Sequence, residues 1–339
     1  MTTKITRRAA LFGGAAATLA AMTGCSNSNT EPETPKPTAT MVAMTFGLTF
    51  IPNVQFAPAY VAVDEGLFHR ENLSITLRHH GQSESLFGAL QAGTEQIVFA
   101  GGSEVMAARD EDLDVMSFAT MYQKYPVSLI VPDDSPIKSP ADLKGRSVGI
   151  PGPFGENYLA LLAMLKQANL PMDQVDVQHI GYTQLAAMQS KRVDSVIGFT
   201  NNDAVQMKRA GLAIREIQLP DDAPLVGAGL ICKTNMVTEY TDALVRFTKC
   251  MAEAIDICRN DPDVAIRATK KHVPGMTSQE DEDAARAVLA ATLPLYGEKV
   301  GAQDFSRWQA MSGFLAETGI TKRKISAEQA CAEQISKKL

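Results

Sequence analysis

The sequence predicts an α/β protein of two lobes that are joined by two strands. Strand and helix patterns alternate along the chain and then alternate again, and its 339 residues suffice for two lobes at roughly 100 to 200 residues per domain. Two predicted strands, at 126–131 and 226–232, cross between the lobes. We therefore expect lobe 1 to be discontinuous, with residues 43–126 and 232–339, and lobe 2 to comprise residues 127–231.

Lobe 1 begins with a short strand and a helix. The apolar alternation over residues 44–50 predicts the strand, which Pro52 and Asn53 end. Pro58 stands in the first turn of the following helix, where its missing N–H group costs nothing, and Gly66 ends that helix. The same kinds of pattern predict further strands at 74–80, 96–100 and 114–121 and helices at 83–93 and 101–109.

Lobe 2 repeats the alternation, and the end of the chain is helical. Residues 139–145 predict one capped helical turn, Asp261-Pro262 begins a helix, and Thr277-Ser-Gln-Glu280 predicts a capping box at the start of another helix. The remaining predicted elements are strands at 147–150, 175–180, 194–199 and 214–218 and helices at 151–168, 184–190, 202–210, 240–260 and 305–317.

The N-terminus has the composition of an export signal. Two arginines, which partly match a twin-arginine signal, precede an apolar run at 9–22 that is too short and too rich in Ala and Gly to span a bilayer as a stable helix. The run ends in a lipobox-like Leu-Ala-Ala-Met-Thr-Gly-Cys25. We expect residues 1–24 to be a signal peptide, Cys25 to be lipidated and residues 25–42 to form a flexible tether. The protein would then be exported and anchored to the outer face of the cytoplasmic membrane, and an uncleaved membrane anchor is the alternative.

Charge and cysteine content exclude several classes of partner. Removal of residues 1–24 takes away three basic residues and no acid, so 29 basic and 38 acidic residues remain, a net charge of −9. This balance argues against nucleic acid and anionic lipid as partners. Four cysteines follow Cys25 and match no zinc or redox spacing, so we interpret them as small buried hydrophobes, with a disulfide as the alternative. They are Cys232, Cys250, Cys258 and Cys331.

Five segments follow predicted strands at their carboxyl ends: 53–56, 101–104, 122–126, 151–157 and 200–206. In open α/β sheets, ligands bind in the crevice outside these ends, so we expect the five segments to converge between the lobes. The candidate ligand-binding residues are Asn53, Gln55, Phe56, Gly102, Ser103, Glu104, Tyr122, Tyr125, Phe154, Glu156, Asn157, Asn202 and Asp203.

The composition of these segments indicates the chemistry of the ligand. They are rich in aromatic and amide side chains, Lys124 is their only basic residue, and Glu104, Glu156 and Asp203 are acidic. An oxyanion would need arginine, lysine or several free helix N-termini. The pattern instead favours a neutral or amine-bearing ring that stacks on aromatic side chains, with a carboxylate that accepts hydrogen bonds from the amine. A purely structural role for the acids, in first turns of helices, is the alternative.

Enzyme motifs are absent from the sequence. Gly101-Gly102-Ser103 and Gly152-Pro-Phe-Gly155 lack the spacing and the lysine of a phosphate-binding loop, and the five histidines show no metal-ligand spacing. We therefore predict no catalytic residue, no metal and no cofactor. A catalytic triad that is assembled only by the fold is the alternative.

Several segments carry a resemblance to known proteins. The export signal, the tether and two α/β lobes with a double-strand hinge resemble a substrate-binding lipoprotein of an ABC importer with the type II periplasmic-binding-protein fold. Segments 50–62, 65–68, 122–126, 142–151 and 201–206 are similar to the thiamine pyrimidine-precursor (NMT1/THI5-like) family, and the resemblance covers about residues 44–275. It implies that the pocket residues are Asn53, Phe56, Tyr122, Tyr125 and Asp203, the last at a position where relatives more often carry glutamate.

The resemblance also implies a function. The protein would be the extracytoplasmic solute-binding component of an ABC importer, a monomer that captures a thiamine-type aminopyrimidine and delivers it to a permease in the cytoplasmic membrane. A riboflavin-binding protein of the same family is the first alternative, and a cavity well above about 300 Å³ would favour that larger ring. A sulfonate or nitrate binder, or an enzyme that uses the same cleft, are the others.

Overall fold

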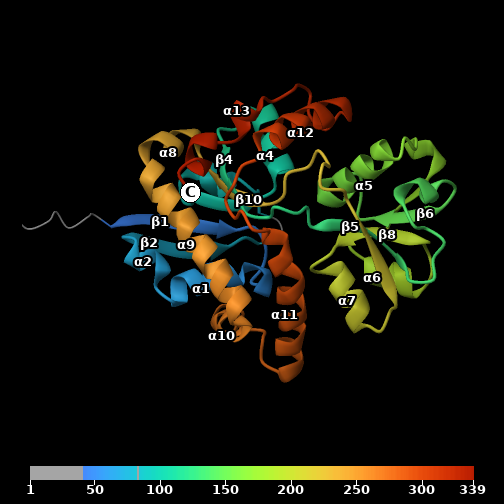
Figure 1. Ribbon diagram of the computed structural model, residues 1–339, viewed down its shortest axis with the longest axis horizontal. Coiled ribbons are helices and arrows are strands. Elements are labelled where there is room, and N and C mark those ends of the chain that lie inside the picture. The colour runs from blue at the N-terminus through green and yellow to red at the C-terminus, as the bar shows by residue number, and fades with distance from the viewer. Residues whose placement is uncertain (1–40, 82–83) are drawn as a thin grey trace, which may run out of the picture. The chain divides into compact units, whose positions relative to one another are not determined.

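The computed structural model describes residues 41–81 and 84–339 (Figure 1). The predicted signal peptide and the lipidated Cys25 lie outside the described residues. Within the described residues, no helix combines the length and the apolar character that a membrane span requires.

The first sheet, here called sheet A, has five strands in the order β2-β1-β3-β10-β4. β1 pairs in parallel with both β2 and β3, whereas β10 lies antiparallel between β3 and β4. All five residues of β4 are buried, as expected for a sheet that helices cover on both faces. The strands are β1 Val42–Leu48, β2 Leu73–His79, β3 Ile97–Ala100, β4 Met116–Thr120 and β10 Gly229–Cys232.

The second sheet, sheet B, repeats this arrangement in the order β7-β6-β8-β5-β9. β6 is parallel to β7 and β8, and β5 lies antiparallel between β8 and β9. β5 therefore occupies in sheet B the place that β10 occupies in sheet A, and each is the strand by which the chain enters its sheet from the other. The strands are β5 Val127–Pro132, β6 Ser147–Ile150, β7 Asp176–His179, β8 Ser195–Phe199 and β9 Ile214–Gln218.

Helices cover both sheets. They are α1 Ala57–Asp64, α2 Leu67–Arg70, α3 Gly88–Ala92, α4 Gly102–Asp110, α5 Gly155–Gln167, α6 Gln184–Gln189, α7 Asp203–Arg209, α8 Thr234–Glu239, α9 Thr241–Asn260, α10 Pro262–His272, α11 Gln279–Thr292, α12 Phe305–Glu317, α13 Ala327–Ala330 and α14 Glu333–Ser336. Short 3₁₀ turns are η1 Val54–Phe56, η2 Pro140–Leu143, η3 Met172–Gln174 and η4 Leu293–Tyr296.

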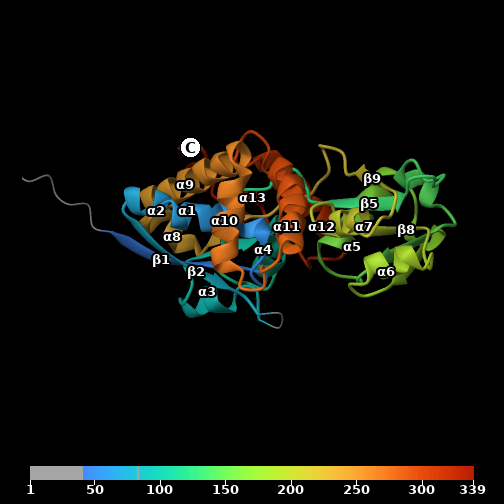
Figure 2. The same ribbon diagram turned by 90° about the horizontal axis from the view of Figure 1, so that it is seen from below.

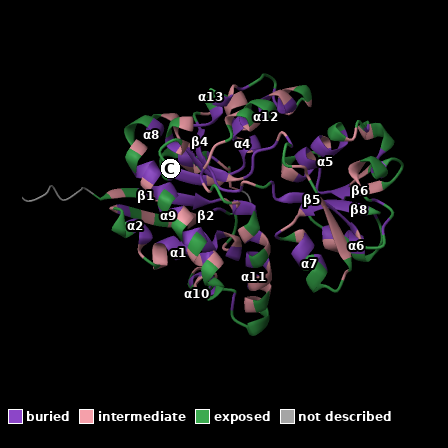
Figure 3. Cartoon of the chain, in the orientation of Figure 1, coloured by how far each residue is buried: buried purple, intermediate pink, exposed green. Residues whose placement is uncertain are grey.

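Figures 1 and 2 show α1, α9 and α10 packed together on one side of sheet A, and α4 beside α12 and α13 on the other. Most strands of both sheets are largely buried, whereas most residues of β2, β7 and β9 are half-buried or exposed (Figure 3). One apolar cluster extends from sheet A into sheet B, because it includes Val98 of β3, Leu129 of β5 and Trp308 of α12. A second cluster, around Phe46 of β1, also includes Val205 of α7. The four described cysteines are buried and free, which confirms their interpretation as small hydrophobes.

The return connection differs from its prediction. The strand predicted at 226–232 begins only at Gly229 and pairs wholly within sheet A, so the predicted lobe boundary between 231 and 232 cuts through β10. Packing is the reason, because a Cβ atom on Gly227 would lie 2.4 Å from the backbone oxygen of Tyr122. The carbonyl of Ala228 accepts hydrogen bonds from both Met121 and Tyr122 N–H groups, which bends the chain before β10. The other residue bounds of the two lobes stay a prediction.

Two helix starts also differ from the sequence prediction. The capping box of α11 is formed by Ser278 and Asp281, one residue later than the predicted pair Thr277 and Glu280. The helix predicted at 83–93 is shorter, because α3 begins at Gly88. Helix α8, between β10 and α9, was not predicted.

Candidate functional site

The loop after β1 is built around Asn53. Its side-chain oxygen accepts a hydrogen bond from the Gln55 N–H group at 3.0 Å and so caps η1, and its own N–H donates to the Tyr60 hydroxyl at 3.3 Å. Gln55 is partly exposed, and Phe56 is buried at the start of α1 with 5% of its surface exposed. The predicted polar contact, Asn53, therefore already uses its oxygen to shape the loop.

A row of aromatic rings extends from this loop across the carboxyl edge of sheet A. Phe56 and Tyr122 both contact Phe99, edge to face, with ring centroids 6.1 and 5.6 Å apart, and Tyr122 contacts Tyr296 at 5.1 Å. The sequence prediction missed Phe99 and Tyr296. Phe99 could have been found, because it stands at the carboxyl end of a predicted strand. Tyr296 could not, since η4 reaches this edge only through tertiary packing.

Two glutamates meet where α4 and α5 begin. Glu104 lies in the first turn of α4 and accepts a hydrogen bond from the Gly101 N–H group at 2.7 Å, and Glu156 lies in the first turn of α5. A Cβ atom on Gly101 would be 3.3 Å from Glu104 Oε2 and 2.6 Å from Glu156 Oε1, so these two oxygens are at most 5.9 Å apart. A helix from each lobe therefore contributes one carboxyl to a pair beside Gly101, and a side chain at position 101 would collide with Glu156.

The surroundings favour a proton on this pair. Burial raises the pKa of Glu104, and burial together with the nearby Glu104 charge raises the pKa of Glu156 to about 8. No basic side chain among the described residues offsets either shift. The buried Tyr125 donates a long hydrogen bond of 3.5 Å to the Glu156 carbonyl, and its pKa is raised by burial and by both carboxyls. With one carboxyl protonated and the other ionised, the two groups can together donate and accept hydrogen bonds.

Asp203 begins α7 and closes the loop after β8. Its carboxylate accepts a hydrogen bond from the Phe199 N–H group at 2.7 Å, and burial raises its pKa. Asn202 is exposed, whereas the preceding Asn201 is buried and donates to the Thr292 hydroxyl of α11 at 3.1 Å. The sequence prediction placed Asn202 among the ligand contacts, but Asn201 is the amide that joins this loop to the helices on sheet A.

Of the remaining candidate ligand-binding residues, three are buried and one is exposed to solvent. Gly102 packs against Val226, with only 2.7 Å from an added Cβ atom to that side chain, and Ser103 is buried beside it. Phe154 is 55% exposed and lies over Gly152 instead of facing the other aromatic rings. Asn157 is buried, and its side-chain oxygen has no hydrogen-bond partner among residues 41–81 and 84–339. The structure thus gives Gly102 and Ser103 a packing role and leaves Asn157 with a free acceptor.

The sequence matches a known protein family and individual binding proteins. The model of the family described as NMT1/THI5 like matches residues 53–265, which is more than half of the chain. The chain belongs to the NMT1/THI5-like family. It is 28% identical to the riboflavin-binding protein RibY of Chloroflexus aurantiacus over 87% of both chains. It is 24% identical to the formylaminopyrimidine-binding protein of Halalkalibacterium halodurans, over 84% of this chain and 87% of that protein.

Among solved structures, this NMT1/THI5-like chain is similar to the periplasmic aliphatic sulphonate binding protein SsuA of Escherichia coli, with a TM-score of 0.70 and 17% identity over 85% of this chain and 91% of that one. At this identity the likeness shows the fold. The predicted two-lobed periplasmic-binding-protein fold and the predicted family are both confirmed.

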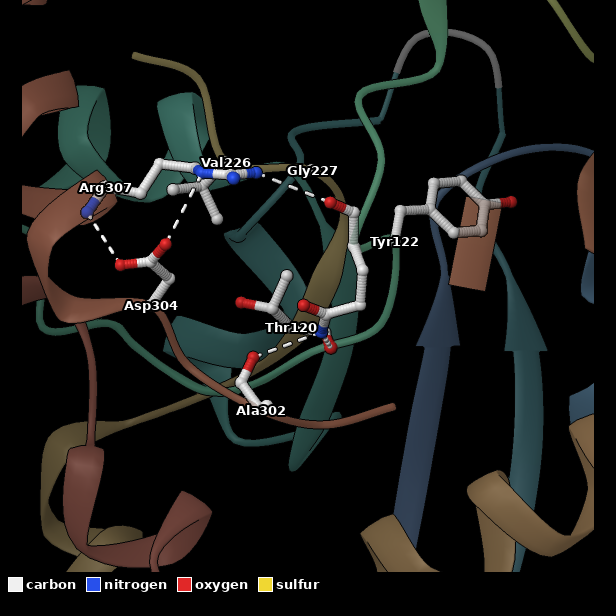
Figure 4. Close-up of a pocket in the computed structure, with 8 residues that line it drawn as sticks. Thr120, Tyr122, Val226, Gly227, Ala302, Asp304 and Arg307 are labelled. Atoms are coloured by element: carbon white, nitrogen blue, oxygen red, sulfur yellow. Dashed lines mark hydrogen bonds and ion pairs between the residues drawn. The ribbon is translucent and has the colours of Figure 1, made fainter. Parts of the chain in front are cut away.

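In the described part of this NMT1/THI5-like chain, two cavities are lined by neither Glu104 nor Glu156. The smaller one, of about 60 Å³, lies where both connections between the sheets meet the segment before α12 (Figure 4). Tyr122 and Gln123 line it, and Arg307 fills part of it and donates to the Gln123 carbonyl at 3.4 Å. The larger one, of about 340 Å³, lies at the opposite edge of sheet A and is lined by Met44, Lys233 and neighbouring residues. The predicted volume of about 300 Å³, above which riboflavin is favoured, refers to a cavity between the five predicted segments and not to these two.

Within the described chain, no three histidine, cysteine or acidic side chains are grouped so that they could hold a metal ion.

Proposed function

We propose that this protein is the extracytoplasmic solute-binding component of an ABC importer and that it captures a small heteroaromatic vitamin precursor. The ligand would lie at the carboxyl edges of the two sheets and carry an amine or a ring N–H group. The observation that carries this proposal is the proximity of Glu104 and Glu156, whose oxygens Oε2 and Oε1 lie at most 5.9 Å apart and have no basic partner within residues 41–81 and 84–339. Groups of this kind need a hydrogen-bond donor or a cation.

The acidic pair argues against an oxyanion ligand. A sulfonate or nitrate would meet Glu104, Glu156 and Asp203 instead of the arginine and lysine side chains that such ligands require. A neutral aminopyrimidine offers an exocyclic amine and a ring nitrogen side by side. Two carboxyls of which one is protonated can accept from the amine and donate to the ring nitrogen, while the row of Phe56, Phe99 and Tyr122 supplies aromatic surface.

Riboflavin is the second candidate. The likeness to the riboflavin-binding protein RibY extends over 87% of both chains, and the tricyclic flavin ring would also suit an aromatic wall. A flavin presents a ring N–H group between two carbonyl groups, so the acidic pair would contact it through a donor and an acceptor as well.

We further propose that the chain binds without catalysis, acts as a monomer, is lipid-anchored at Cys25 and delivers its ligand to a membrane permease. The fold by itself does not separate binding from catalysis, because one fold supports both. The support comes from relatives that are named as binding proteins.

The test is native mass spectrometry of freshly purified protein, followed by thermal unfolding with riboflavin, a 4-aminopyrimidine and an alkanesulfonate. A true ligand at about 100 times its Kd stabilises the protein by about 2.7 kcal/mol. Stabilisation by the sulfonate alone would overturn the proposal, and turnover of either ring compound would overturn its non-enzymatic part.

Variants at position 53 refine this test. Asn53→Ser keeps an oxygen that caps η1 but removes the amide N–H donors, so we expect wild-type stability and about tenfold weaker binding, the loss of roughly one hydrogen bond. Asn53→Asp, which also caps, is the matched control for charge. Unchanged affinity in both variants would remove Asn53 from the ligand site.

A further inference from the structure

A chain of hydrogen bonds lies beneath the loop that carries Asn53 and Phe56. His79, the last residue of β2, contacts the Phe50 carbonyl through Nδ1 and the Tyr60 hydroxyl through Nε2, each at 3.0 Å. The Tyr60 oxygen also accepts from the Asn53 backbone N–H group at 3.3 Å. His79 is therefore linked to the loop both before and after its turn.

The hydrogen-bond partners of His79 determine the protonation state that this chain of hydrogen bonds requires. A carbonyl oxygen can only accept, so Nδ1 of His79 carries the hydrogen. Nε2 of a neutral ring then has a lone pair and accepts from the Tyr60 hydroxyl, whose oxygen is left to accept from Asn53. With a second hydrogen on Nε2, the Tyr60 hydroxyl would have to turn its own hydrogen away from His79, and that hydrogen would lose its acceptor. Every group has a matching partner only when His79 is neutral.

Residues 50–53 depend on this chain of hydrogen bonds because the apolar side chains at positions 50 and 51 do not anchor them. Phe50 and Ile51 are 47% and 42% exposed. Thr49 holds the start of the loop through a hydrogen bond to the Phe99 carbonyl at 2.6 Å, and Phe56 holds its end by packing. Val54 is buried as well, so His79 and Tyr60 supply the hydrogen bonds for the part of the loop before it, at Phe50 and Asn53.

We propose that neutral His79 is a positioning residue: it fixes residues 50–53, thereby orients Asn53 and Phe56 for the ligand, and releases them when it is protonated. This inference rests on the function proposed above. His79 acts through Tyr60 and the loop backbone.

The charged groups around His79 agree with a neutral ring. On α1 and α10, His272 stacks on Tyr60 with ring centroids 4.6 Å apart and pairs with Asp64, which also binds Lys271. On the sheet side, the neighbouring His80 pairs with Glu95, and that glutamate also binds Arg78, which in turn binds Glu84. Both nearby carboxylates are thus engaged elsewhere, and the Phe56 ring covers a further side of His79 at 5.6 Å.

The pKa of His79 follows from these surroundings. Burial lowers it, the Phe50 carbonyl opposes that effect, and the charges of His272 and His80 lower it further from its ordinary value of 6.5. The ordered loop is therefore fully stabilised above pH 6.5, and the stabilisation is lost as the pH falls through the lowered pKa.

The first experiment needs no ligand. Hydrogen exchange of the Asn53 and Gln55 amides, corrected for the intrinsic effect of pH, measures how often the loop opens. We expect protection to fall about tenfold between pH 7.5 and pH 5, the loss of roughly one hydrogen bond, because a protonated Nε2 no longer accepts from the Tyr60 hydroxyl. His79→Gln introduces a side-chain amide that can donate and accept hydrogen bonds but does not titrate, so protection should become independent of pH. Tyr60→Phe should lower the protection at both pH 7.5 and pH 5.

His69→Gln is the matched control, because this exposed histidine lies on α2. Nitrogen NMR of His79 should also show the Nδ1–H form. Protection that does not change with pH in the wild type, or that changes equally in His79→Gln, overturns the proposal.

The second experiment measures the affinity for riboflavin and for a 4-aminopyrimidine over the same pH range. Weaker binding at low pH in the wild type and His69→Gln, but a flat profile in His79→Gln, supports the proposal. If neither probe binds while loop protection still follows His79, the proposed function is overturned and the role of His79 in the loop stands.

Discussion

Two effects determine the protonation of Glu156: its burial and the nearby charge of Glu104. Because its pKa is raised to about 8, the folded protein holds a proton that the unfolded chain releases near pH 4.5. The free energy of unfolding must therefore decrease as the pH rises from about 4.5 to about 8.

Glu156→Gln should remove most of this decrease. One pKa unit corresponds to about 1.4 kcal/mol, and solvent screening of the partly exposed side chain reduces the full effect to about 2 kcal/mol. Chemical denaturation at pH 5 and pH 8 measures it, with Glu298→Gln, at an exposed position, as the control. A variant that keeps the wild-type slope would show that the pair is separated in solution.

Phe56 illustrates how a residue in the proposed site can also be part of the core. The sequence alone suggests alanine at positions 53 and 56 as a test of binding. Only 5% of the surface of Phe56 is exposed, so Phe56→Ala should lower the free energy of unfolding of the protein by about 3 to 5 kcal/mol. The sequence showed its type and its place after β1, but not its burial, which depends on His79 and Phe99.

At the scale of elements, the sequence offers two possible capping boxes for the start of α11, and only the structure shows which of them forms. Thr277-x-x-Glu280 and Ser278-x-x-Asp281 both satisfy the rule for a capping box. In the structure the Asp281 carboxylate accepts from the N–H groups of Thr277 and Ser278, at 3.0 and 2.8 Å, and the Ser278 hydroxyl accepts from Asp281 N–H at 3.2 Å. Ser278 and Asp281 therefore form the capping box of this helix.

Ser278→Ala should therefore cost about 1 kcal/mol, whereas Thr277→Ala should stay within about 0.5 kcal/mol of the wild type. Denaturant unfolding of both variants measures the difference directly. A larger loss for Thr277→Ala would move the helix start back to the position that the sequence pattern first suggests.

Elements with strong local signals were predictable, and those set by distant contacts were not. Helix α12 begins at Phe305 and ends at Glu317, as its apolar spacing and the following Gly319 predict. Strand β10 begins later than predicted because the close contact of Gly227 with Tyr122 ends the extended chain, and no local pattern records that contact. The same holds for the site: each glutamate was predictable as a candidate, but their pairing arises from the fold.

At the scale of the whole molecule, the two connections between the sheets act as one unit. They run between β4 and β5 and between β9 and β10, and the Ala228 carbonyl joins them through hydrogen bonds from Met121 and Tyr122 at 2.9 and 2.8 Å. Hinge closure in such proteins depends on a few connecting residues that absorb changes in backbone angles. Contacts at this junction should therefore affect both stability and ligand binding.

Gly227→Ala tests this coupling. Its added Cβ atom would lie 2.4 Å from the Tyr122 backbone oxygen, so the two connections must move apart, at a cost of about 1 to 3 kcal/mol. We also expect weaker binding of any ligand held between the sheets, although Gly227 lies outside the predicted ligand contacts. Gly275→Ala is the control, since an added Cβ atom there meets nothing within 4 Å and should be neutral or slightly stabilising. Denaturant unfolding and ligand titration of both variants separate the two effects: a loss of stability with unchanged affinity would show that the junction supports the fold without taking part in closure.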